Sequence, residues 1–407
     1  MTGVAPLTPY QRRLFVFLSV ATFFEGYDFL ALTQILPNLR QEMGIDEAAA
    51  GALVAFINVG TVLAYLLVRK ADRWGRRKVL TATIYGYTIF TFLSGLSPNV
   101  WVFAIFQMIA RVFLIGEWAT SMVIAAEEFP AARRGMVLGV INACASLGSV
   151  FCAGVVPLLL NHTPWGWRTV YFVGVLPLIY IAYARRNLKE TERFVQQGAA
   201  EEPRPILAIW KTPHKKRVLQ LGLIWFLTYI CTQNGVTFFK EFAVAERGLT
   251  DGQVGLSIAI AAVASMPLVF YSGKLLDVVG RQFGAAIIFG MASVGVFSSY
   301  TLHGFVPLTI ALVFSIFGVS AVLPVLNAYT TELFPTKLRG DGFAWSNNIL
   351  GRIGYVLSPA VVGWFARDVG WGNAVRVTAV FPIIAVALIF LLLPETRNRE
   401  LEDTAAL

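Results

Sequence analysis

The sequence predicts an all-helical membrane protein with twelve transmembrane helices in two pseudo-symmetric halves of six. Three observations support this fold class. Hydrophobic residues make up 57% of the chain and charged residues only 14%, whereas a soluble domain carries about 25% charge. The charges gather between apolar runs long enough to cross a bilayer, which takes about 17–25 residues each. Charged motifs in the first half also recur in the second half at one constant spacing.

The apolar runs define the expected spans. They lie at 14–36, 52–68, 79–96, 102–126, 136–160, 169–184, 218–239, 254–271, 285–302, 305–330, 343–365 and 374–393. An even number of spans places both termini on one side of the membrane. The loops on that side hold most of the Lys and Arg, and cytoplasmic loops are rich in these residues. We therefore expect both termini in the cytoplasm, and we attribute the net charge of +9 to loops facing anionic lipid rather than nucleic acid.

A polar stretch in the middle of the chain separates the two halves. We expect one six-helix bundle at 1–184, a cytoplasmic linker at 185–217 and a second bundle at 218–407. The three cysteines lie inside apolar runs without disulfide or metal-site spacing, and the three histidines lie at loops or helix ends. We therefore expect no metal and no cofactor.

The repeat is the most specific feature of the sequence. Asp72, Gly75 and Arg76 recur 205 residues later as Asp277, Gly280 and Arg281. The same spacing relates five further pairs: Glu127 and Glu332, Phe129 and Phe334, Pro130 and Pro335, Arg134 and Arg339, and Gly135 and Gly340. Several motifs that share one offset indicate a tandem duplication of a membrane unit. Parallel repeats of this kind pack about an axis along the membrane normal and leave a cavity between the halves.

The repeated residues resemble a known family. The stretch Asp72-Arg73-Trp74-Gly75-Arg76-Arg77 is similar to the signature loop of the major facilitator superfamily of secondary transporters. Glu25-Gly26-Tyr27-Asp28 resembles the start of aromatic-acid/proton symporters, although that pattern begins with Asp. Gly116-Glu117-Trp118 resembles an element of metabolite/proton and sialic-acid symporters, and Pro394–Arg397 resembles the terminus of sugar and organic-ion transporters. Gly116 follows Arg111 by five positions, where the family spacing is four.

The resemblance implies a gating role for the two charged turns. In this superfamily the Asp of the signature loop locks the inner side of the two halves together, and glycine permits a tight turn. The predicted gating residues are Asp72, Arg73, Gly75, Arg76, Glu127, Arg134, Asp277, Arg281, Glu332 and Arg339. The alternative is that these charges only set the topology of the chain.

Ionisable residues within apolar runs are costly in a bilayer and are functional candidates. Asp28, Glu25 and Glu117 are the predicted proton-coupling residues. Glu25 and Asp28 are three positions apart, so they share one helix face. Two carboxylates this close disfavour double ionisation, so one of them can carry a proton. The alternative is a fixed salt bridge between Asp28 and Arg111 that only holds two helices together.

The predicted substrate-binding residues combine cations, amides and aromatic side chains. They are Arg111, Arg352, Tyr27, Gln34, Tyr229, Gln233, Asn234, Asn327 and Asn347. The planar guanidinium of an arginine can bind a substrate carboxylate through two hydrogen bonds. The alternative for each amide is a hydrogen bond between neighbouring helices.

We therefore expect a monomeric secondary transporter in the plasma membrane, the inner membrane of a bacterium. It would move a small organic anion, an aromatic or other carboxylate, inward with protons by alternating access. A sugar-like or cationic cargo, export of drug-like molecules, and a membrane sensor of substrate stay open as alternatives. An enzyme is disfavoured because no nucleophile–base or metal constellation is evident, and no phosphate-binding loop indicates ATP-driven pumping.

Overall fold

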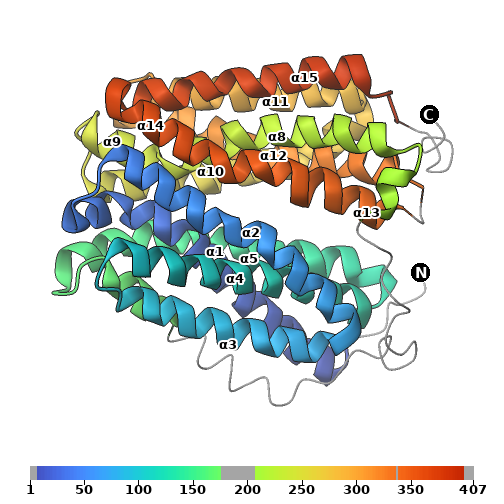
Figure 1. The fold of residues 1–407 in the computed structure, drawn as a ribbon, viewed down its shortest axis with the longest axis horizontal. Helices are drawn as coiled ribbons and strands as arrows, with labels where there is room; N and C mark the ends of the chain where they lie inside the picture. Colours follow the sequence, from blue (N-terminus) through green and yellow to red (C-terminus); the bar gives the residue numbers. More distant parts are fainter. Residues whose placement is uncertain (1–6, 176–206, 336–337, 398–407) are drawn as a thin grey trace. The chain divides into compact units, whose positions relative to one another are not determined.

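The computed structural model describes residues 7–175, 207–335 and 338–397, and the regular structure within these ranges is helical (Figure 1). Eight helical stretches in these ranges are long and apolar enough to cross a membrane. This agrees with the predicted polytopic helical protein. Most of the predicted linker and the second part of the predicted sixth span lie outside the described residues.

The helices of the first half are α1 (Pro9–Met43), α2 (Glu47–Trp74), α3 (Arg76–Gly95), α4 (Val100–Glu128) and α5 (Ala131–His162). Those of the second half are a 3₁₀ turn (Ala208–Lys211), α8 (Lys215–Thr237), α9 (Phe239–Ala245), α10 (Asp251–Val279), α11 (Arg281–Ser299), α12 (Phe305–Glu332), α13 (Arg339–Phe343), a π-helix (Ala344–Gly351), α14 (Arg352–Arg376), a second 3₁₀ turn (Val377–Ala379) and α15 (Val380–Leu392). Polar caps start two of them: Asn99 accepts the N–H of Val102 at the start of α4, and Thr250 and Gln253 form a capping box on α10.

Two of the predicted boundaries differ from the structure. The sequence predicts the first span to end at Pro37, but Pro37 lies inside α1, which continues to Met43. Membrane helices tolerate proline because the freed backbone groups find other partners in the bundle. The charged stretches at 69–78 and 273–284 are also mostly helical, because only Gly75 and Gly280 interrupt them. Their φ angles of 94° and 105° lie in the region that favours glycine.

The chain folds into two compact units, one of Met1–Leu39 with Phe56–Pro203 and the other of Arg40–Ala55 with Arg204–Leu407. The end of α1 and the start of α2 therefore belong to the second unit, although they precede most of the first unit in sequence. The predicted bundles at 1–184 and 218–407 stay a prediction.

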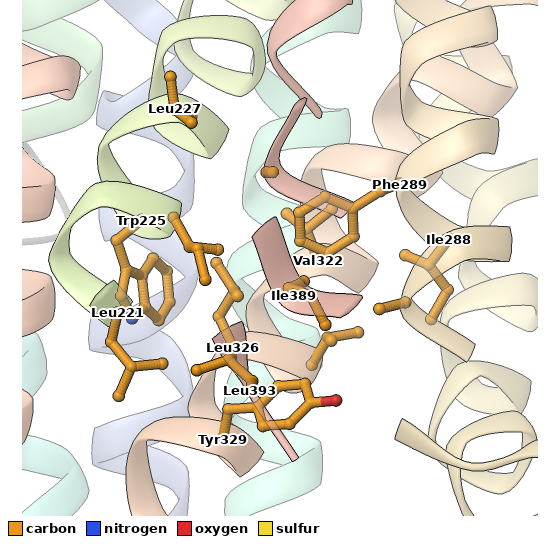
Figure 2. Packing of buried hydrophobic residues seen from close by; sticks show 14 of the residues in the cluster. Leu221, Trp225, Leu227, Ile288, Phe289, Val322, Leu326, Tyr329, Ile389 and Leu393 are labelled. Carbon is orange, nitrogen blue, oxygen red and sulfur yellow. The ribbon is translucent and has the colours of Figure 1, made fainter. Parts of the chain in front are cut away.

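The apolar core of the second unit joins its longest helices. Within this unit α12 packs against α10 and α11, and α8 packs against α14 and α15 (Figure 1). Trp225 from α8, Phe289 from α11, Leu326 from α12 and Ile389 from α15 meet in one buried cluster (Figure 2). The indole N–H of Trp225 donates to the Thr330 hydroxyl at 3.1 Å, so its polar atom is satisfied within the core.

In the first unit, close helix contacts fix the position of α1. Gly26 and Gly148 allow the backbones of α1 and α5 to touch, because a Cβ on Gly26 would lie 1.9 Å from the carbonyl oxygen of Ala145. On the other side, Ala21 shares a buried cluster with Tyr87 of α3 and with residues of α4. The turn of α1 that carries Glu25 and Asp28 is therefore held between neighbouring helices.

Candidate functional site

The first unit concentrates acidic side chains in its interior. Glu25 and Asp28 lie one turn apart on α1, and Arg111 and Glu117 lie on α4; each is at most 5% exposed. The hydroxyl of Tyr87, on α3, donates a hydrogen bond to Asp28, which also lies in the field of Arg111. Tyr87 interacts electrostatically with all four charged residues. The structure therefore brings the three predicted proton-coupling residues and Arg111 together around one tyrosine.

Asp28 and Arg111 do not form the fixed salt bridge considered above. Among the described residues, no ion pair within 4 Å joins Arg111 to Asp28. The guanidinium of Arg111 instead lies 5.2 Å from the centre of the Phe29 ring. This cation–π contact partly stabilises Arg111 without using its hydrogen-bond donors. Asp28 is therefore held by a tyrosine rather than locked by an arginine.

Glu25 has a different environment from Asp28, although they share a helix face. Both carboxylate oxygens of Glu25 are buried, and neither has a hydrogen-bond partner in the described part of the chain. The carboxyl of Glu117 lies close enough for the two groups to repel each other when both are ionised. Burying an ionised carboxylate without a partner is very costly. Glu25 and Glu117 therefore form a buried carboxyl pair in which a negative charge on one disfavours a negative charge on the other.

Two other residues predicted to bind substrate in this unit are buried. Tyr27 is 1% exposed, and its hydroxyl donates to the carbonyl of Val170 at 2.9 Å. Gln34 is fully buried on the same helix. The hydroxyl of Tyr27 is thus used in holding α1 to the segment around Val170.

The second unit places a cation between aromatic rings. Arg352, the first residue of α14, lies with its guanidinium 5.3 Å from the ring centre of Tyr229 and 5.0 Å from that of Tyr355. The Tyr229 hydroxyl donates to the side-chain oxygen of Asn347 at 2.8 Å. The Nε of Arg352 is buried and has no acceptor, and the described residues supply no carboxylate partner for this arginine. Arg352 is thus oriented by aromatic faces while its hydrogen-bond donors stay available.

A π-helix positions these residues, and the sequence did not reveal it. Residues 344–351 form this wider helix directly before Arg352, and Asn347 lies within it. π-Helical turns are rare and occur frequently at functional sites. The part of the apolar run that precedes Arg352, residues 343–351, contains no proline to mark the wider turn. Tyr355 was missed for a related reason, because a tyrosine in an apolar run gives no signal of its partner.

The remaining amides of the second unit have mixed environments. The Asn234 amide donates to the Ser358 hydroxyl at 2.9 Å and to the carbonyl of Ile230 at 2.7 Å, so it joins α8 to α14. Its side-chain oxygen is buried without a partner in the described ranges. Gln233 is 9% exposed, and Asn327 is exposed on α12. Asn327 is therefore not part of the cluster around Arg352.

The two charged turns have nearly equal geometry. We call Gly75, Arg76 and Glu127 the first charged turn. The second charged turn consists of Gly280, Arg281 and Glu332. The Nη2 of each arginine pairs with Oε1 of the corresponding glutamate, at 3.3 Å in the first turn and 3.2 Å in the second. The side chains of Asp72, Arg73 and Arg134 lie outside the described part, whereas Arg339 begins α13.

The second charged turn has further partners. Arg281 also pairs with Asp277 at 2.8 Å. Glu395, which follows α15, accepts the backbone N–H groups of Arg281 and Gln282 at 2.9 Å each, at the start of α11. Partial burial of Glu395 opposes its ionisation, but these N–H bonds outweigh it and lower the pKa of Glu395 below its ordinary value. The second charged turn is therefore hydrogen-bonded to the segment that follows α15.

A buried charge cluster around α9 was not predicted at all. We call Arg40, Glu47, Lys240, Glu241 and Asp251 the α9 cluster. Lys240 is fully buried and pairs with Asp251 at 2.7 Å, while Glu241 is 2% exposed on its side chain and pairs with Arg40 at 2.7 Å. Arg40 also pairs with Glu47. Burial raises the pKa of Glu241 above its ordinary value, although Arg40 opposes this shift. The cluster fixes residues 40–55 within the second unit.

Comparison with known proteins decides the family. The chain matches the Major Facilitator Superfamily in two overlapping segments, residues 18–351 and 236–406. The chain belongs to the Major Facilitator Superfamily. The predicted fold class, a twelve-helix transporter fold, is thereby confirmed. The protein is a multi-pass membrane transporter of small molecules and not an enzyme.

Similar transporters cover nearly the whole chain. A putative metabolite transport protein of Haemophilus influenzae is 27% identical over 402 residues, which span 93% of this chain and 95% of that protein. The sialic acid transporter NanX of Escherichia coli is 23% identical and is covered to 94%, as is this chain. A cis,cis-muconate transport protein of Acinetobacter baylyi is 25% identical, with 93% of each chain covered.

Solved structures show the same fold. A bacterial homologue of the human lysosomal transporter Spinster, in an inward-facing unoccupied conformation, has a TM-score of 0.78 at 16% identity, covering 95% of this chain and 97% of that chain. A D-xylose–proton symporter has a TM-score of 0.74 at 18% identity, covering 95% and 99%. At such identities the likeness shows the fold alone.

Proposed function

We propose that this transporter moves a small organic anion together with protons. The observation that carries the proposal is the environment of Arg352, which lies within a membrane-spanning stretch without a carboxylate partner among the described residues. A guanidinium at membrane depth without a counter-ion is costly. A substrate carboxylate removes this cost, because the planar fork of arginine matches its two oxygens.

The surroundings of Arg352 favour a carboxylate attached to a flat or unsaturated skeleton. Tyr229 and Tyr355 face the guanidinium, and Asn347 fixes the Tyr229 hydroxyl. Aromatic rings provide apolar contact area beside the charge. Two relatives support an acidic cargo through their names, one a sialic acid transporter and the other a cis,cis-muconate transport protein.

Proton coupling belongs, in this proposal, to the carboxyl groups of the first unit. A negative charge on Glu25 or Glu117 disfavours a second one on its partner, so a proton on this pair is favourable when the site is dry. Asp28 accepts a hydrogen bond from Tyr87 and lies near Arg111, and these two contacts offset part of the cost of burying its ionised form. We assign the carried proton to Glu25, with Glu117 as its partner and Asp28 as the group through which it leaves.

The charged turns act as the gate in this proposal. Arg76 and Arg281 each hold a glutamate in one geometry, and breaking both pairs would accompany the change of conformation. We place both termini in the cytoplasm, because most Lys and Arg would then lie on the cytoplasmic side. We also place the protein, as a monomer, in the bacterial inner membrane.

The test is uptake by purified protein in liposomes with an alkaline lumen. We expect radiolabelled cis,cis-muconate or sialic acid to accumulate while the lumen acidifies, and an ionophore that dissipates the proton gradient to abolish accumulation. Accumulation of xylose but of neither acid would contradict an anion site. Binding of the acids without flux would contradict transport and indicate a sensor.

A further inference from the structure

The last three turns of α10 border a hollow that the transport mechanism does not use. It has a volume of about 440 Å³ and lies within the second unit, where α10, α11 and α12 diverge. Tyr271, Lys274, Leu275 and Val278 line it, and these positions repeat at the spacing of one helix face. The buried Phe317 of α12 also borders it. The hollow is thus an apolar groove along a membrane-spanning helix.

Two glycines that are adjacent in sequence to lining residues face open space. A Cβ added to Gly273 on α10, or to Gly290 on α11, would meet no atom within 4 Å. Tyr271 and Val278, on the rim, are 68% and 59% exposed. These large side chains flank the groove instead of filling it. Elongated apolar matter from the bilayer fits this space, because most of its lining is apolar and its rim is exposed.

One positive charge lies along this apolar groove. Lys274 is exposed, and within the described residues it has no ion-pair partner. The nearest acid along the helix, Asp277, is already paired with Arg281 at 2.8 Å. Lys274 precedes the end of α10 at Val279 by five residues. Its ammonium group can therefore reach the headgroup layer while its methylene stem lies along the apolar groove. Tyr271, one turn earlier, is of the type that anchors helices at this depth.

We propose that the groove is a binding site for an anionic phospholipid. One acyl chain lies along Leu268, on the side of Lys274 away from the helix end, and the headgroup phosphate pairs with Lys274 and accepts a hydrogen bond from Tyr271. Charge complementarity selects the lipid class, because a zwitterionic headgroup gains less from an uncompensated lysine. The site is separate from Arg352 and from the acidic interior of the first unit.

Native mass spectrometry of the delipidated transporter tests the site with phosphatidylglycerol and phosphatidylcholine that carry identical acyl chains. We expect one phosphatidylglycerol to bind about fivefold more tightly than phosphatidylcholine, which is the worth of one interfacial lysine. Lys274→Gln should abolish this preference, and Lys274→Arg should retain it. The matched control is Lys216→Gln, which removes an exposed lysine at the start of α8 and should change nothing.

Leu268→Trp, which fills the groove where the acyl chain lies, should weaken binding of both lipids while the thermal unfolding midpoint stays unchanged. Glycerol 3-phosphate, which has the phosphate but no acyl chain, should not displace bound phosphatidylglycerol. A lipid preference that survives Lys274→Gln would overturn the proposal. Displacement by glycerol 3-phosphate would overturn it too, because the site would then recognise free phosphate.

Discussion

The two units have similar charged turns but different interiors. Arg76 and Arg281 meet their glutamates at 3.3 and 3.2 Å after glycines of the same backbone conformation. The interior of the first unit instead carries three buried carboxyl groups around Tyr87, whereas that of the second presents Arg352 between two tyrosines. The two units thus share their turns, while the first buries three carboxyl groups together with Arg111 and the second places Arg352 between aromatic rings.

This divergence suggests a division of labour. If both units had kept the same buried charged residues, like charges would lie at membrane depth in each unit, and burying each of them would cost free energy. In the proposed function the two interiors bind different ligands, a proton in the first unit and an anion in the second.

The largest effect should come from Arg352→Ala. Loss of the cation that pairs with a substrate carboxylate costs about 2–5 kcal/mol, a loss of about 30-fold or more in affinity. The measurement is binding of cis,cis-muconate to the purified protein. Arg367→Ala, on the same helix but exposed, is the control and should bind normally. If both variants bind alike, Arg352 has a structural role and the second interior is not an anion site.

Glu25→Gln should separate driven uptake from exchange. The amide cannot release a proton, so accumulation against a gradient is lost, whereas exchange of labelled for unlabelled substrate needs no net proton movement. Both are measured in the same liposomes. Glu42→Gln, an exposed change on α1, should preserve both activities. Normal accumulation by the Glu25 variant would show that the acidic interior does not carry the proton.

Gly75→Ala and Gly280→Ala test whether the charged turns are equivalent. Each places a side chain at positive φ, which costs about 1–2 kcal/mol. The second variant should be the less stable, because its Cβ would also lie 2.9 Å from a carboxylate oxygen of Glu395. Thermal unfolding midpoints in detergent measure this order. Equal midpoints would mean that Glu395 moves freely and does not brace the second turn.

The smallest effects should follow from Arg76→Gln and Arg281→Gln. A partly exposed ion pair contributes about 0.2–1 kcal/mol, so each change should alter the transport rate only a few-fold and leave substrate affinity intact. The two changes should have effects of similar size, because each arginine pairs with its glutamate at nearly the same distance. A change in affinity rather than rate would argue against a gating role for the turns.

Much of the fold was predictable because each crossing of the bilayer requires an apolar run, which is visible in the sequence. Apolar runs mark the spans, and the constant offset from Asp72 to Asp277 marks the duplication. The extent of the helices was less predictable. Charged residues such as Arg69 and Lys78 suggest a loop, yet a helix tolerates them at its ends, and only Gly75 stops it.

The site was predictable only in part. Glu25, Asp28 and Arg352 stand out because charge inside an apolar run is rare. Their partners Tyr87 and Tyr355 do not, since their role comes from helices that meet only in the folded chain. The pair of Lys240 with Asp251 was missed for the opposite reason, because charged residues between two spans are expected to be solvated.

The division between a proton site and an anion site is tested most directly by the protons taken up when substrate binds. Titration of the protein with cis,cis-muconate in buffers of different ionisation enthalpy gives this number calorimetrically. We predict that the natural protein takes up protons on binding, that Glu25→Gln binds the acid with less proton uptake, and that Arg352→Ala does not bind it. Unchanged proton uptake by Glu25→Gln would contradict the account.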